Sequence, residues 1–167
     1  MKRSEQRRKG RAASVFCRIA GILVLAAVIT ALLPLTVPRL MGYEIYNVVS
    51  GSMEPEIPVD SVIYVKYKDP VTIEDGEIVA FMSGGSVVMH RVVSNHQVES
   101  YFTTKGDANE QEDLNNVSYD NVIGTVVKHI PVLGQVMVIY AGFYGKILLF
   151  CMALCGALLN VLAGRLQ

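Results

Sequence analysis

Residues 50–55 (Ser-Gly-Ser-Met-Glu-Pro) place two hydroxyl groups and a glycine on a short turn that ends at a proline. A serine hydroxyl is a weak nucleophile at neutral pH and needs a base within hydrogen-bond reach to take its proton. His90, Asp107 and Asp113 follow further along the chain and supply the remaining parts of a serine hydrolase. The sequence therefore indicates nucleophilic catalysis by a serine.

His90 is the histidine best placed to be the base. It lies in the alternating run 87–93, where its side chain shares a strand face with Val88 and Val92. Histidine titrates near neutral pH, so it serves as a base without the strong perturbation that a lysine needs. The competing interpretation is a packed core histidine on an apolar strand face. His96, in the turn-like segment 94–97, and His129 are expected at the surface.

A catalytic histidine needs a partner on its second ring nitrogen to fix its tautomer and to stabilise the imidazolium. Asp107, directly after Gly106, and Asp113 are the candidates. Either aspartate could equally form a turn, because residues 106–109 (Gly-Asp-Ala-Asn) are typical turn sequence.

The elements that must position these residues are short strands. Between residues 42 and 130, β-branched and aromatic runs alternate with turn residues, and the step 83–86 (Ser-Gly-Gly-Ser) predicts a hairpin. The pattern predicts a mainly β domain, either an all-β sandwich or a partly open barrel. The expected strands are 43–49, 61–67, 77–82, 86–93, 98–104 and 122–130.

The rest of the chain is apolar, and 51% of all residues are hydrophobic. Residues 19–38 carry no charge and, at roughly 1.5 Å per residue, cover a hydrocarbon core of roughly 30 Å. A second uncharged run covers 147–164 and follows the apolar segment 131–146, which is either interfacial or part of one longer tilted helix. We therefore expect two transmembrane helices.

Positive charge gathers in residues 1–18, where seven lysines and arginines precede the first apolar run against Glu5 alone. This distribution predicts a basic cytoplasmic tail, both termini in the cytoplasm and an extracytoplasmic domain at 42–130. A nucleic-acid or lipid-headgroup patch is the alternative for the tail. A cleaved signal peptide is the alternative for residues 1–41, but Pro38 and Arg39 would hinder cleavage, so an uncleaved anchor is favoured.

The three cysteines, Cys17, Cys151 and Cys155, lie in or beside the apolar segments and are typical of small apolar filling side chains. They predict no disulfide framework and no metal site, and no cofactor is expected. The remainder of the chain after the basic tail is net acidic, which argues against nucleic acid as a partner of the middle domain.

Three sequence boxes in order behind an apolar anchor resemble those of type I signal peptidases. They are residues 50–55, residues 90–93 (His-Arg-Val-Val), and residues 105–109 (Lys-Gly-Asp-Ala-Asn) followed by Glu112-Asp113. The likeness covers roughly residues 15–130. It is to the endoplasmic-reticulum type, also found in archaea and spore-forming bacteria, in which histidine replaces the lysine of the common bacterial enzymes. The family box often reads Gly-Asp-Asn-Asn followed by two aspartates, so the third box here departs from it at Ala108 and Glu112.

The resemblance implies a role for each matched residue. Ser52 would be the nucleophile and His90 the general base, with Asp113 as the first choice to orient His90 and Asp107 as the second. The backbone N–H of Ser52, aided by the Ser50 hydroxyl, would stabilise the oxyanion. The resemblance also implies a membrane-bound serine endopeptidase that removes signal peptides from exported preproteins after a small-x-small motif. Its expected partners are preproteins, the lipid bilayer and accessory membrane subunits.

Two other functions remain open at this point. A non-catalytic membrane subunit would bind a partner through its β domain. A self-cleaving regulator with a serine-lysine dyad would have to use Lys105, the one lysine near the boxes. Residues 116–118 (Asn-Val-Ser) form a glycosylation sequon, which has meaning only in a eukaryotic source.

Overall fold

The computed structural model describes the backbone of residues 2–165 and the side chains of residues 11–165. The basic side chains before Arg11, on which the predicted topology depends, lie outside the described residues. The chain divides into two compact units: a helical unit formed by the residues up to Thr36 and from Ile139, and a β unit over Val37–Val138. Each unit is described by itself.

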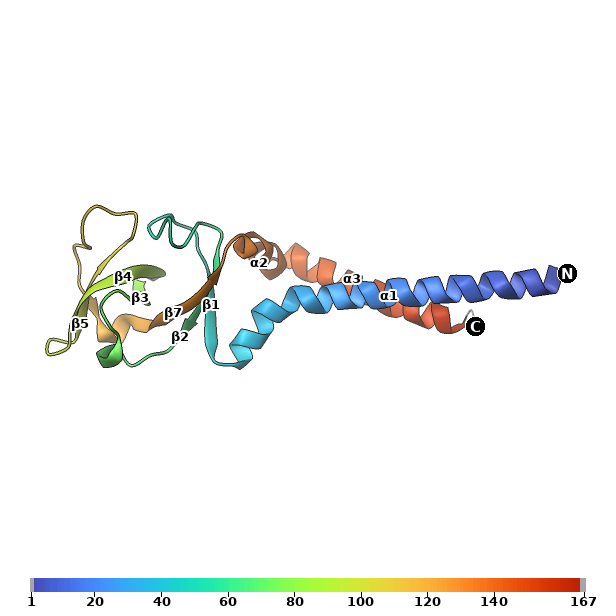
Figure 1. The fold of residues 1–167 in the computed structure, drawn as a ribbon, viewed down its shortest axis with the longest axis horizontal. Coiled ribbons are helices and arrows are strands. Elements are labelled where there is room, and N and C mark those ends of the chain that lie inside the picture. The colour runs from blue at the N-terminus through green and yellow to red at the C-terminus, as the bar shows by residue number, and fades with distance from the viewer. Residues whose placement is uncertain (1, 166–167) are drawn as a thin grey trace. The chain divides into compact units, whose positions relative to one another are not determined.

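The β unit contains one antiparallel sheet of seven strands in the order β1-β2-β7-β3-β4-β5-β6 (Figure 1). The mainly β class predicted from the sequence is confirmed. The sheet is open, because β1 and β6 lie at its two edges, and no second sheet occurs in the described residues to form a sandwich. The strands are β1 (Tyr43–Asn47), β2 (Val62–Lys66), β3 (Ile78–Ser83), β4 (Ser86–His96), β5 (Tyr101–Lys105), β6 (Val117–Ser118) and β7 (Val122–Ile130).

Strand alternation buries both faces of this sheet. On β3 and β4, Ile78, Ala80 and Met89 pack in one hydrophobic cluster, whereas their neighbours Val79 and Phe81 pack in the other. Successive strand residues point to opposite faces, so one run of apolar residues supplies both clusters. The fully buried members include Met53, Ile57, Ile63 and Val65 in the first cluster and Ile73, Val92 and Phe102 in the second.

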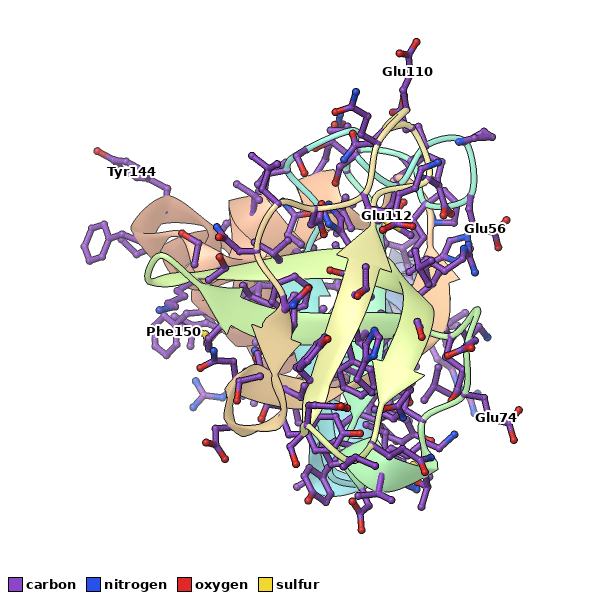
Figure 2. The ribbon with its side chains drawn as sticks, turned by 90° about the vertical axis from the view of Figure 1, so that its left-hand side faces the viewer. Glu56, Glu74, Glu110, Glu112, Tyr144 and Phe150 are labelled. Carbon is purple, nitrogen blue, oxygen red and sulfur yellow. The ribbon has the colours of Figure 1, made fainter. Side chains whose placement is uncertain are left out.

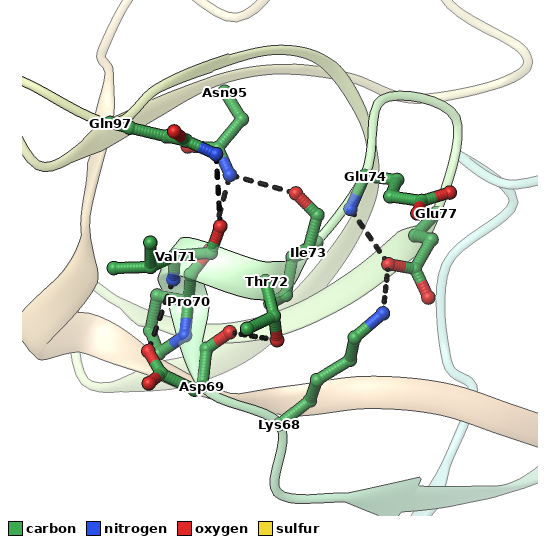
Figure 3. Close-up of polar contacts among 10 residues, drawn as sticks. All are labelled: Lys68, Asp69, Pro70, Val71, Thr72, Ile73, Glu74, Glu77, Asn95 and Gln97. Carbon is green, nitrogen blue, oxygen red and sulfur yellow. Dashed lines mark hydrogen bonds and ion pairs between the residues drawn. The ribbon is translucent and has the colours of Figure 1, made fainter.

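The loop between β2 and β3 is held by two side-chain amides, one from Asn95 near the end of β4 and one from Gln97 just after that strand (Figure 3). Asn95 Nδ2 donates to the carbonyls of Pro70 and Ile73 at 3.1 and 2.7 Å, and Gln97 Nε2 donates to the Val71 carbonyl at 3.0 Å. This loop contains the 3₁₀ turn η1 (Pro70–Thr72), and a second such turn, η2 (Tyr119–Asn121), follows β6.

The turn predicted at residues 94–97 is wrong for its first three residues, because β4 continues to His96. Residues 94–96 pair with 101–103 of β5 after a register shift between Val92 and Ser94. The His96 ring stacks on Tyr101 with centroids 4.3 Å apart. Cross-strand pairing therefore overrides the local turn preference.

Glu77 ends the same loop and pairs with Lys68 Nζ at 2.6 Å, while its carboxylate also accepts from the Glu74 N–H at 2.8 Å (Figure 3). Burial acts to raise the pKa of Glu77, but the hydrogen bonds from Lys68 and Glu74, with the Lys68 charge, hold it below its ordinary value of 4.5. A carboxyl group with a lowered pKa stabilises the fold above its unfolded pKa, and this contribution is lost as the pH falls through the folded pKa.

We expect Glu77→Gln to lower the free energy of unfolding at pH 7 by about 1 kcal/mol or less, because the pair is partly exposed. The difference from wild type should disappear at pH values well below 4.5, as urea denaturation would measure. Glu74→Gln is the matched control, because among the described residues Glu74 takes part in this network through its backbone N–H and not through its side chain. An equal loss at acid and neutral pH would contradict the assignment.

The helical unit contains most of α1 (Lys2–Leu40) and all of α3 (Phe143–Arg165), and α2 (Leu133–Ala141) precedes α3. The Ser14 hydroxyl donates to the Ala163 carbonyl at 2.7 Å. A Cβ added to Gly21 would lie 2.8 Å from the Gly156 carbonyl oxygen. Small residues therefore allow the backbones of α1 and α3 to approach closely and antiparallel, as is common between helices in lipid.

Two helices are long and apolar enough to cross a membrane, Arg11–Leu40 and Phe143–Arg165, among the residues described. Both are longer than the segments expected from the sequence, 19–38 and 147–164. The apolar segment 131–146 is not one continuous helix, because α2 ends at Ala141 and α3 begins at Phe143. The membrane-spanning role of both helices stays a prediction.

Candidate active site

The turn that carries Ser52 is anchored by two buried apolar side chains. Met53 and Ile57 are 1% and 0% exposed and pack in the first hydrophobic cluster. The Ile57 N–H donates to the Met53 carbonyl at 2.8 Å, and the Glu54 N–H donates to the Gly51 carbonyl at 3.0 Å. Burial of the residue after the serine thus fixes the turn, while Ser52 itself stays half-buried.

A second loop, between β5 and β6, holds this turn through the backbone. The Ala108 N–H donates to the Ser52 carbonyl at 2.9 Å, and the Asn109 N–H closes a turn on the Gly106 carbonyl at 3.0 Å. A Cβ added to the buried Gly106 would lie 2.7 Å from the Ser52 carbonyl oxygen. This close approach of two backbones is the reason that a glycine stands at position 106.

We expect Gly106→Ala to displace the Ser52 turn, since backbone atoms cannot move aside as a flexible side chain can. Any hydrolysis that depends on Ser52 should fall by about 100-fold, the cost of a misplacement near 1 Å in a catalytic group. Gly164→Ala is the control, because a Cβ there meets nothing within 4 Å. The two variants are compared by kcat and by Tm, and wild-type kcat in Gly106→Ala would contradict the prediction.

His90 lies on β4 with its ring between the sheet and the β5–β6 loop. It contacts Phe81 edge to face with centroids 6.3 Å apart, and its Nδ1 is 2.5 Å from Asp113 Oδ2. Their side chains are only 12% and 22% exposed. A carboxylate can only accept, so Nδ1 carries the proton and Nε2 is left as the basic nitrogen.

Thr104 holds Asp113 in place from the end of β5. Its hydroxyl donates to Asp113 Oδ2 at 2.7 Å, and its carbonyl accepts from the Asp113 N–H at 2.9 Å. Thr104 is fully buried. The sequence alone did not identify Thr104 as part of the site, because a threonine within an ordinary strand has no feature that marks it as functional.

Asp107 contacts Arg91, the neighbour of His90, and not His90 itself. Arg91 Nε and Nη2 donate to the two carboxylate oxygens of Asp107 at 2.8 and 2.6 Å. The Asp107 hydrogen bond raises the pKa of Arg91, against the opposing effect of burial. Adjacent strand residues point to opposite faces, so the β5–β6 loop contacts β4 on both faces, at His90 through Asp113 and at Arg91 through Asp107. Figure 2 shows Glu110 projecting outward from this loop.

The structure brings together His90 and Asp113, but it does not join Ser52 to them by a hydrogen bond within the described residues. The Ser52 hydroxyl lies 3.5 Å from the Ser50 hydroxyl. Catalytic hydrogen bonds are often long in enzymes without substrate and tighten in the complex. Lys105 is the cross-strand partner of Arg91, which puts it on the face opposite to His90. No group of three His, Cys, Asp or Glu among residues 11–165 could hold a metal ion.

Comparison with known proteins identifies the class to which this fold and site belong. A family model described as Peptidase S24-like matches residues 35–127, more than half of the chain. Signal peptidase I W of Bacillus subtilis (strain 168) is 38% identical over 89 residues, covering 51% of this chain and 47% of the relative. The signal peptidase complex catalytic subunit SEC11C of Homo sapiens is 32% identical over 104 residues, covering 55% and 54%.

A third relative, the signal peptidase complex catalytic subunit SEC11 of Debaryomyces hansenii, is 28% identical over 129 residues and covers 70% of this chain and 77% of itself. The chain belongs to the Peptidase S24-like family, and these relatives group it with the type I signal peptidases. It spans about half the length of the first curated relatives that it matches.

Proposed function

We propose that this protein is a membrane-bound serine endopeptidase that removes N-terminal signal peptides from exported preproteins. The observation that carries the proposal is the contact of His90 Nδ1 with Asp113 Oδ2 at 2.5 Å. It leaves Nε2 as a base in a chain whose relatives are named signal peptidases. The backbone hydrogen bond from Ala108 to Ser52 supports the same assignment, because it ties the serine turn to the loop that carries Asp113.

The proposed reaction uses these groups in sequence. Ser52 Oγ attacks the scissile carbonyl carbon while its proton passes to His90 Nε2, and the Asp113 carboxylate stabilises the imidazolium. The Ser52 N–H, aided by the Ser50 hydroxyl, donates to the tetrahedral oxyanion. Collapse breaks the C–N bond, and His90 returns the proton to the leaving amine. Water, deprotonated by His90, then hydrolyses the acyl-enzyme and restores Ser52.

The two apolar helices support a site held near a membrane surface, and the basic residues of 1–18 support an orientation with both termini in the cytoplasm and the β unit outside. Enzyme and preprotein in one bilayer would meet at a raised effective concentration, which offsets weak contacts with small side chains before the cut. Two relatives are named catalytic subunits of a signal peptidase complex, which supports accessory membrane subunits as further partners.

The test is cleavage of a purified preprotein by the full chain in detergent, with the N-terminus of the product sequenced. We expect one cut after a small-x-small motif, and no cut at that position when the residue before it is changed from alanine to leucine. No cleavage in detergent or in lipid vesicles would overturn the proposal and favour the non-catalytic membrane subunit.

A further inference from the structure

A pocket of about 230 Å³ lies beside His90. Phe81, Val88 and Leu114 give it apolar walls, and Ser83 and Asn115 add polar groups. Its volume exceeds the roughly 150 Å³ of an engineered cavity that takes up benzene, so a side chain of up to aromatic size fits. Ser50 and Ser52 are not among its lining residues.

The β3–β4 hairpin builds the floor of this pocket, and the β5–β6 loop builds its rim. Phe81 pairs with Val88 across the two strands, and Phe81 is 5% exposed. Ser83 follows two residues later on β3 and therefore points to the same face as Phe81. Leu114 is 99% exposed and lies beside Asp113, so it stands at the mouth of the pocket.

The proton route places the pocket relative to the bond that is cut, and this step rests on the proposed function. The histidine that takes the serine proton returns it to the leaving amine, so the residue after the scissile bond must pass His90. The pocket has a wall formed by His90 and Asp113 but none formed by either serine. A pocket that contacts the base and neither serine fits a position on the leaving side of the scissile bond.

We infer that this pocket binds the side chain of the first residue of the mature protein, with a preference for an apolar side chain. Apolar walls favour such a side chain through the area that it removes from water. The polar groups at Ser83 and Asn115 leave room for a bound water where the side chain is small. The enzyme would then select for the residue after the cut as well as for the small residues before it.

Two preproteins that differ only in the first residue after the cut, leucine or glycine, test the inference. Ser83→Phe places a ring on the pocket face from an exposed strand end, so it should fill the pocket without disturbing the core. The leucine-to-glycine ratio of kcat/KM should fall by about 10-fold or more. Met82→Phe is the matched control, because Met82 is the strand neighbour, points to the opposite face and does not line the pocket.

Leu114→Ala acts in the opposite direction without risk to folding, since this side chain is almost fully exposed. By widening the mouth it should raise the cleavage of a preprotein with phenylalanine after the cut relative to one with leucine. If folded Ser83→Phe and Leu114→Ala both keep the wild-type ratios, the inference is wrong while the proposed function stands. If wild type cuts none of the preproteins, both fail.

Discussion

Ser52→Ala should lower kcat for preprotein cleavage by roughly 10⁴- to 10⁶-fold, the range found when the nucleophile of a serine peptidase is removed. The variant lacks the oxygen proposed to form the acyl-enzyme, and neither His90 nor the proposed oxyanion donors can replace it. The Ser52 carbonyl keeps its hydrogen bond from Ala108, so the turn should remain folded. The measurement is single-turnover cleavage of a purified preprotein, with the Tm recorded for each variant.

Ser50→Ala is the matched control for this experiment. It removes a hydroxyl 3.5 Å from that of Ser52 and leaves the nucleophile intact. Because Ser50 would only assist the oxyanion, we expect a smaller loss, at most about 10²- to 10³-fold in kcat. The assigned nucleophile would be wrong if Ser52→Ala still cleaved at a near wild-type rate, or if Ser50→Ala were the more severe variant.

The second prediction distinguishes the roles of Asp113 and Asp107. Asp113→Asn should lower kcat by about 10⁴-fold, because an amide no longer fixes the Nδ1–H tautomer of His90 or stabilises its protonated form. Asp107→Asn weakens the two-point contact with Arg91 and leaves the His90 contact in place. It should act mainly on stability, with a loss of about 1–3 kcal/mol in the free energy of unfolding.

A pH–rate profile distinguishes these two roles. In Asp107→Asn the profile of kcat should keep its wild-type shape, whereas in Asp113→Asn it should change, because His90 has lost the carboxylate that contacts its Nδ1. Thr104→Val gives a further control, since it removes one hydrogen bond to Asp113 but keeps the carboxylate. If Asp107→Asn lost more activity than Asp113→Asn at equal stability, the assignment of the orienting acid would be reversed.

The sequence predicted strand positions well where alternation is regular. Residues 122–130 form β7 with the predicted bounds, and the 83–86 step is the predicted hairpin between β3 and β4. It failed where pairing overrides local preference. Residues 94–96 read as a turn in isolation, and the two-residue β6 is too short to leave a periodic signal.

The candidate site, too, was only partly predictable from the sequence. The types and order of Ser52, His90 and Asp113 marked them in the sequence, but the choice between Asp113 and Asp107 depends on which carboxylate the loop turns toward His90. That geometry is set by the hydrogen bond from Thr104 to Asp113 and by the close approach of the Gly106 backbone to the Ser52 carbonyl. Both contacts become visible only in the folded structure. Spacing along the chain carries neither kind of information.

The β5–β6 loop described above binds the Ser52 turn through Ala108, Arg91 through Asp107 and His90 through Asp113. The proposed nucleophile, the proposed base and Arg91 thus all depend on one short segment. Opening of the whole segment would break all three contacts together. The fraction of molecules able to react at a given moment therefore cannot exceed the fraction in which this loop is closed, and the loop's local stability sets that upper limit.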